Sequence, residues 1–116
     1  MKTVSVIAFK NKDKDNRFLS NGMDAGDWSD EDLDVHIDNI ENAFMIWRKD
    51  FSKPTENDVD DLLKQSQAHK KLMIKRFGDD AIINFDVENW LIQYEPINLE
   101  ITKEQFQLHL EWLDTM

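Results

Sequence analysis

The sequence predicts an α+β domain in which a helical hairpin and a C-terminal helix pack on a small, mainly antiparallel sheet. The prediction rests on apolar residues that alternate with polar ones in some segments and recur at steps of three and four in others. In chain order these segments read β-α-α-β-β-β-α, an order typical of helices packed on an antiparallel sheet. A chain of 116 residues buries roughly two-thirds of the surface of its unfolded form, enough for one core. Residues 1–116 are therefore expected to form a single domain.

The first segment, residues 3–9, is predicted to be a buried strand, because its side chains are mostly β-branched or apolar. The apolar run is too short for the core of a secretion signal, and no small-residue cleavage site follows it. Residues 10–26 are polar, carry charges of both signs and contain the turn sequence Asn21-Gly22. A long loop is therefore predicted there.

A first helix is predicted from the N-cap Ser29 to about Phe51. Trp28, just before the cap, is placed to pack on Leu33 as a hydrophobic staple. Apolar residues then recur at steps of four and three, which predicts one buried stripe along the helix. The stripe consists of Leu33, Ile37, Ile40, Phe44, Trp47 and Phe51.

A second helix is predicted after Pro54, where Thr55 and Asp58 have the spacing of an N-terminal cap, and it should end at Gly78. Acidic residues fill its first turns and basic residues its last ones, the polarity that the helix dipole favours. Because the connection between the two helices is short, we expect them to form an antiparallel hairpin.

The last third of the chain predicts three strands and a helix. Alternating apolar residues indicate strands at residues 81–87 and 90–94, joined by a turn at Glu88-Asn89, and a further strand at residues 97–101. Residues 102–105 read Thr-Lys-Glu-Gln, which has the form of a capping box. A helix is therefore predicted from there to about Asp114.

The charge distribution is the most informative feature for function. Residues 24–41 contain eight carboxylates and neither Lys nor Arg, and residues 24–63 contain 13 acids against three bases. This stretch has a net charge of −10, equal to that of the whole chain, because the remainder carries 11 charges of each sign. On a helix, Asp30/Asp34 and Asp34/Asp38 would repel each other at i,i+4 spacing. Folding therefore does not require this charge, and a basic partner is its natural complement.

We therefore predict that an acidic face of the first helix binds a basic protein, with Trp28 as an interface anchor. Charges along one such helix are ~5 Å apart, against one per ~1.7 Å in a DNA duplex, so any mimicry of DNA would be partial. The predicted partner-binding residues are Asp24, Asp27, Trp28, Asp30, Glu31, Asp34, Asp38 and Glu41.

Other kinds of chemistry find little support in the sequence. The absence of cysteine excludes a disulfide framework and a thiolate metal site, and it favours a reducing cytoplasm. His36, His69 and His109 lack metal-ligand spacing, and no nucleophile elbow or phosphate-binding loop is present. We expect no catalytic residue, cofactor, metal or membrane span. Direct nucleic-acid binding is not expected either, because the basic clusters at residues 10–17 and 70–76 have ordinary structural explanations.

The leading hypothesis is a small cytoplasmic inhibitor that masks a basic partner, such as a nuclease or a nucleic-acid-binding complex. One version is a phage or mobile-element protein that blocks a host defence system, including CRISPR or restriction enzymes. The alternatives are an immunity protein that neutralises a toxin nuclease, and a housekeeping domain whose acidity only keeps it soluble. A small enzyme is a further hypothesis from a different class.

Overall fold

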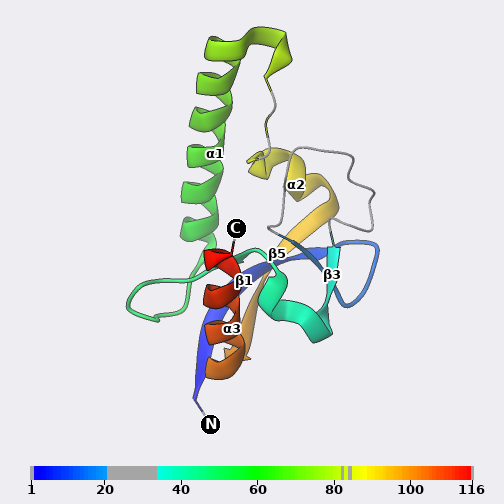
Figure 1. Ribbon diagram of the computed structural model, residues 1–116, viewed down its shortest axis with the longest axis vertical. Helices are drawn as coiled ribbons and strands as arrows, with labels where there is room; N and C mark the ends of the chain where they lie inside the picture. Colours follow the sequence, from blue (N-terminus) through cyan, green and yellow to red (C-terminus); the bar gives the residue numbers. More distant parts are fainter. Residues whose placement is uncertain (1, 21–33, 82, 84, 116) are drawn as a thin grey trace.

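The computed structural model describes residues 2–20, 34–81, 83 and 85–115 of the chain (Figure 1). These residues form an antiparallel five-stranded sheet with helices, which confirms the predicted α+β class. The elements are β1 (Thr3–Asn11), β2 (Arg17–Leu19), β3 (Asp34–His36), the 3-10 helix η2 (Ile37–Asn42), β4 (Met45–Ile46), α1 (Glu56–Phe77), the 3-10 helix η3 (Gly78–Asp80), α2 (Val87–Gln93), β5 (Tyr94–Thr102) and α3 (Lys103–Asp114).

Strand β1 is the centre of the sheet. On one side it pairs with β5 along its whole length, from Thr3↔Thr102 to Asn11↔Tyr94. On the other side β2 pairs near its C-terminal end and β4 pairs near its middle, while β3 extends the sheet beyond β2. The strands predicted at residues 3–9 and 97–101 are therefore confirmed, and both are longer than predicted.

The loop predicted at residues 10–26 contains a strand, β2, that the sequence analysis missed. The turn before it is built by Asn11, whose Oδ1 accepts hydrogen bonds from the backbone N–H groups of Asp13 (2.9 Å) and Lys14 (3.1 Å). Asn16 then adopts a positive φ of 65°, which asparagine tolerates better than most residues. Phe18 and its neighbour Leu19 are buried, but two apolar residues are too short a pattern to predict a strand.

The helix predicted from Ser29 to Phe51 is wrong for the part that the structure describes. Residues 34–46 form β3, η2 and β4 instead, and residues 29–33 lie outside the described ranges. The cause is visible in residues 44–47, whose side chains alternate between two cores: Phe44 and Ile46 pack in one, and Met45 and Trp47 in the other. A strand covered on both faces reads as a continuous apolar run. Such a run also satisfies helical spacing, so the two structures cannot be separated by periodicity alone.

The β-hairpin predicted at residues 81–94 is also wrong. The described residues of the segment 81–86 carry no strand, and Val87–Gln93 forms helix α2. Asp86 is the N-cap of α2, since its carboxylate accepts a hydrogen bond from the backbone N–H of Asn89 (3.2 Å). Ser66 on α1 fixes this start, because its Oγ accepts from Val87 N–H (2.8 Å) and donates to the Phe85 carbonyl (3.1 Å).

The second and third predicted helices are confirmed as α1 and α3. In α1 the Asp58 carboxylate accepts from the backbone N–H of Thr55 (2.7 Å), and the helix ends at Gly78, whose φ is 61°. In α3 the capping box is complete, with Thr102 and Gln105 each accepting from the other's backbone N–H at 3.0 Å. The predicted antiparallel pairing of two long helices does not occur in the described part of the chain, because residues 34–51 form no α-helix there.

The sheet has a hydrophobic core on each face. One core lies between the sheet, η2 and α3, and its buried members include Val4, Val6, Ala8, Phe18, Ile40, Ala43, Met45, Ile101 and Phe106. The other lies between the sheet, α2 and the first half of α1, and its buried members are Phe9, Leu19, Val87, Trp90 and Tyr94.

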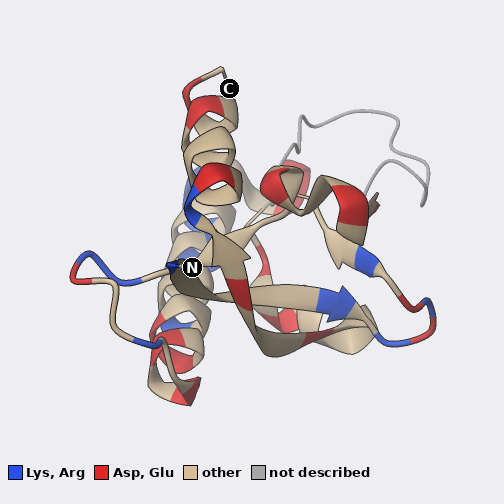
Figure 2. Cartoon of the chain, turned by 90° about the horizontal axis from the view of Figure 1, so that it is seen from below, with Lys and Arg blue, Asp and Glu red and all other residues tan. Residues whose placement is uncertain are grey.

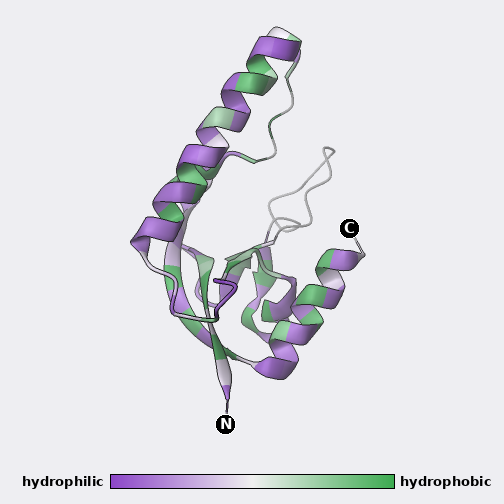
Figure 3. Cartoon of the chain, turned by 90° about the vertical axis from the view of Figure 1, so that its left-hand side faces the viewer, coloured by the Kyte–Doolittle hydropathy of each residue, from purple (hydrophilic) through white to green (hydrophobic). Residues whose placement is uncertain are grey.

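The far end of α1 extends beyond the sheet and both cores (Figures 1 and 3). The overall extents of 50 × 29 × 29 Å reflect this projection. Leu72, Ile74 and Phe77 on this end are exposed, so the apolar surface of α1 continues past the point where the domain can cover it.

Candidate functional site

The predicted acidic face is only partly within the described residues. Asp24, Asp27, Trp28, Asp30 and Glu31 lie outside them, so their part of the prediction stays a prediction. Asp34, Asp38 and Glu41 are described, and they do not share a helix face. Asp34 belongs to β3, while Asp38 and Glu41 belong to η2, in which Asn39 has non-helical backbone angles.

Asp34 is a buried structural carboxylate, which corrects its assignment as a partner-binding residue. The residue is only 7% exposed. It accepts hydrogen bonds from the Tyr94 hydroxyl and from Asn11 Nδ2 (3.4 Å), and Lys14 Nζ lies 4.0 Å away. Buried charges are tolerated in proteins when they are paired and hydrogen-bonded. Asp34 therefore joins β3 to β1 and β5 rather than facing a partner.

Helix η2 packs against α3 through His109, which is almost fully buried. Its Nδ1 lies 2.8 Å from the carbonyl oxygen of Glu41, so Nδ1–H is the donor and Nε2 is unprotonated. Among the described residues Nε2 has no hydrogen-bond partner, and burial lowers the pKa of this imidazole. The ring packs edge-on against Trp47 at 5.5 Å. This contact holds η2 against α3.

A surface that we call the η2–α3 face results from this packing. Asp38 is exposed and Glu41 half-buried on η2, while α3 contributes residues at steps of four and three, which share one flank of a helix. Leu108, at the centre of that flank, is 44% exposed. Figure 2 shows acidic residues on both elements. The face is formed by Asp38, Glu41, Glu104, Leu108 and Glu111.

The buried His109 predicts a pH-dependent loss of stability. Because its folded-state pKa is lowered, the unfolded chain takes up a proton as the pH falls below about 6.5, whereas the folded chain does not. The free energy of unfolding should therefore decrease from about pH 6.5 downward, until the folded-state pKa is reached. Urea unfolding of the parent and of His109→Gln at several pH values measures this.

The His109→Gln variant is the control, because an amide can still donate to the Glu41 carbonyl but does not titrate. His36 and His69 remain in both proteins, so their contributions cancel. The difference in free energy between the two proteins should narrow as the pH decreases from about 7 to about 5. If the difference in free energy of unfolding stays constant over this range, then His109 is not a buried neutral imidazole.

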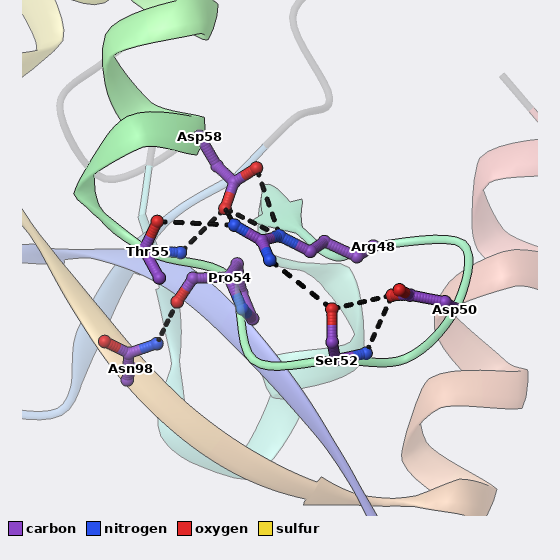
Figure 4. A network of polar contacts seen from close by, with 7 residues as sticks. All are labelled: Arg48, Asp50, Ser52, Pro54, Thr55, Asp58 and Asn98. Atoms are coloured by element: carbon purple, nitrogen blue, oxygen red, sulfur yellow. Dashed lines mark hydrogen bonds and ion pairs between the residues drawn. The ribbon is translucent and has the colours of Figure 1, made fainter.

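The loop at residues 48–55 is a second candidate site, and the sequence analysis missed it (Figure 4). Arg48 organises the loop: its Nη2 lies 2.8 Å from Asp58 Oδ2 and its Nε lies 3.0 Å from the same oxygen. The same guanidinium donates to Ser52 Oγ (3.4 Å) and Thr55 Oγ1 (3.3 Å). The Arg48 hydrogen bonds and the Thr55 N–H lower the pKa of Asp58.

Two further contacts fix the same loop. The Asp50 carboxylate accepts from both the N–H (3.0 Å) and the hydroxyl (2.7 Å) of Ser52, and Asn98 on β5 donates to the Pro54 carbonyl (3.1 Å). Between these anchors Phe51 has a φ of 61° and is 57% exposed. Positive φ is rare for a bulky side chain and costs of order 1–3 kcal/mol. The surrounding contacts therefore hold an aromatic ring on the surface in a strained conformation.

Phe51 forms one wall of a groove of about 600 Å³ between this loop, the start of β1 and α3. The apolar walls come from Val4, Phe51, Phe106 and Leu110, and the charged lining residues are Lys2 and Lys103. Lys103 and Leu110 lie on the flank of α3 away from Glu104 and Glu111. One helix thus carries an exposed acidic flank and a separate basic, apolar flank along the groove.

The sequence contains a partial indication of this loop. Pro54 and Thr55 correctly predict a break before α1, but the apolar spacing that includes Phe51 predicts the end of a helix. The Asp50-Phe51-Ser52 sequence suits a turn in which a carboxylate caps nearby backbone groups. The pairing of Arg48 with Asp58 depends on the path of the loop, and spacing alone does not reveal it.

The part of the chain that the structure describes has neither a metal-ligand cluster nor a membrane-spanning helix. Within it, His, Asp and Glu side chains do not gather in groups of three that could hold a metal ion. Nor does any helix of that part combine the length and the apolar character that a membrane crossing needs. In the comparisons with known proteins, no family model, curated protein or solved structure matches the chain.

Proposed function

We propose that this protein binds a basic protein partner, of the kind that acts on or holds nucleic acid, and masks its cationic surface. The observation that carries the proposal is the net charge of −10, which is concentrated in residues 24–63. A surface of one sign attracts an oppositely charged partner and accelerates association. A phage-encoded blocker and an immunity protein both fit this description.

The η2–α3 face is the part of the described surface that we assign to this partner. Its four carboxylates come from elements that are far apart in sequence and are held together by the contact between His109 and Glu41. Residues 24–32 precede β3 and η2 in the chain and carry further acids, so they belong to the same proposal as sequence neighbours.

Leu108 gives this face an apolar centre. Interfaces draw most of their affinity from a few apolar or aromatic anchors surrounded by polar residues. Glu104 and Glu111 lie one helical turn before and after Leu108 on the exposed flank of α3. A basic partner with a small apolar depression between cationic side chains would complement this arrangement.

The test begins with identifying the partner by affinity purification from the native host, followed by binding measurements with the purified partner. Association should be fast at low salt and slower as salt rises, because exposed charges are screened. The double variant Asp38→Lys/Glu111→Lys should bind at least about tenfold more weakly. Its melting temperature should stay close to that of the parent, since both side chains are exposed.

A matched control separates the face from the overall charge. Asp60→Lys/Asp79→Lys also changes two exposed acids to bases, and each double variant adds four positive charges to −10, giving −6. The control should bind nearly as well as the parent. Equal weakening by both double variants, or binding that does not respond to salt, would show that the η2–α3 face is ordinary solvated surface.

A further inference from the structure

We propose that the groove beside Phe51 binds an extended, acidic peptide segment of another protein, which adds as a strand to the open edge of β1. This goes beyond the proposed function, because it uses a different flank of α3 and a ligand of the opposite charge. The proposal rests on the edge of the sheet, on the lining of the groove and on the conformation of Phe51.

Strand β1 is only partly paired on the edge that faces β4. In the described part of the chain, β4 pairs with β1 only at Ile7 and Ala8, whereas β5 pairs with all nine residues of β1 on the other side. Among the described residues, therefore, no strand lies beside residues 3–6 on the β4 side. Backbone groups at such an edge can hydrogen-bond an added strand, a common mode of peptide recognition. Thr3 and Val4, at the start of this edge, line the groove.

The groove has apolar walls and positively charged lining residues. Side chains of a strand alternate, so every second residue of an added peptide would face the apolar walls formed by Val4, Phe106 and Leu110. The charged residues of the lining are Lys2 and Lys103, and Lys49 and Lys53 are exposed on the adjacent loop. Carboxylates on either side of an apolar peptide residue would complement these ammonium groups.

Phe51 has a strained backbone conformation. Energy stored in a positive φ persists only where surrounding contacts fix it, and such strain is concentrated at functional sites. Here the contacts of Arg48 and Asp50 fix the loop on both sides of Phe51. Phe106 meets the ring edge-on at 5.8 Å, while more than half of Phe51 stays exposed. A pre-positioned aromatic ring is a typical anchor in binding sites.

The test uses a fluorescein-labelled peptide, Glu-Thr-Leu-Thr-Glu, in which both carboxylates and the leucine lie on one side of a strand. The matched control peptide is Lys-Thr-Leu-Thr-Lys. Fluorescence anisotropy should show saturable binding of the acidic peptide and at least about tenfold weaker binding of the basic one. Amide hydrogen exchange at Thr3 and Ser5, whose N–H groups face away from β5, should slow when the acidic peptide is bound, because pairing protects these groups.

Two variants separate binding from folding. Phe51→Gly removes the ring and relieves the strain, so its melting temperature should be equal to or higher than that of the parent while peptide binding falls at least about tenfold. Phe51→Asn, which also tolerates positive φ, should behave in the same way and excludes loop flexibility as the cause. Lys103→Glu should weaken peptide binding, whereas Lys75→Glu on the far end of α1 should not.

Several outcomes would overturn the proposal. It is wrong if neither peptide binds, if both bind equally, or if Phe51→Gly retains full binding. It is also wrong if the acidic peptide binds without protecting Thr3 and Ser5, because the peptide then does not add to the sheet. Concentration-dependent dimerisation that Phe51→Gly abolishes would show that a second copy of the chain occupies the groove instead.

Discussion

Replacing Asp34 with alanine is expected to lower the free energy of unfolding by about 3 kcal/mol or more. The carboxylate is buried and accepts from the Tyr94 hydroxyl and Asn11 Nδ2. Its removal takes this acceptor away from both donors, and the loss of a buried hydrogen bond to a charged group costs about 1.5–3 kcal/mol. Urea unfolding followed by circular dichroism measures the change.

Two control variants make the Asp34 result specific. Asp38→Ala removes an exposed acid two positions beyond β3, and it should change the stability by no more than about 0.5 kcal/mol. Asp34→Asn keeps one acceptor oxygen in place and should be less damaging than Asp34→Ala. If Asp34→Ala is as stable as Asp38→Ala, then the Asp34 carboxylate does not stabilise the fold through its hydrogen bonds with Tyr94 and Asn11.

Asp34 illustrates why the candidate site could be predicted only in part. Its charge and its acidic neighbours are visible in the sequence, but its burial depends on Tyr94, which lies 60 residues away in the chain. Asp38, with the same charge and similar neighbours, is exposed. Local charge density therefore predicted that the surface is acidic, but not which carboxylates are available to a partner.

The helix starts that were predicted correctly are those fixed by local capping contacts. The start of α1 at Thr55 and Asp58 and the start of α3 at Thr102 and Gln105 are fixed by hydrogen bonds between residues three apart. Both were predicted correctly. Such interactions are encoded within a single turn of helix, so the sequence alone reveals them.

The wrong predictions share a different cause, which is that tertiary packing overrides a local pattern. The apolar residues of the segment 44–47 serve two cores on opposite faces of the sheet, and their near-continuous run imitated a helical stripe. At residues 81–94 the alternation suggested strands, yet Asp86 caps a helix that buries Val87 and Trp90. Here the N-cap residue Asp86 is a better indicator than the alternation of apolar residues, because an N-cap is specific to a helix start.

The groove beside Phe51 could not be predicted from the sequence, for a related reason. Its walls come from β1, the loop and α3, which meet only after the chain has folded. The charged residues Lys2 and Lys103 are separated by almost the whole length of the chain. Nothing in their local sequence indicates that they line the same groove.

The second large effect is expected for Phe9→Ala, which should lower the free energy of unfolding by about 3–5 kcal/mol. Phe9 is 0% exposed, at the centre of the core between the sheet, α1 and α2. Its ring contacts Phe44 (centroids 5.7 Å apart) and Trp90 (6.1 Å). Truncation removes buried apolar surface and leaves a cavity that the paired strand β1 cannot collapse to fill.

The matched control is Phe77→Ala, because Phe77 is 56% exposed at the end of α1 and its truncation should change the stability by no more than about 0.5 kcal/mol. Near-ultraviolet circular dichroism should also lose intensity in Phe9→Ala, since the ring of Trp90 loses a fixed neighbour. A domain of this size has a stability of about 5–15 kcal/mol in total, so Phe9→Ala removes a large part of it. If Phe9→Ala unfolds at the same urea concentration as Phe77→Ala, then Phe9 does not join the sheet to α2. The core that positions Trp90 and the first half of α1 would then have to be assigned to other residues.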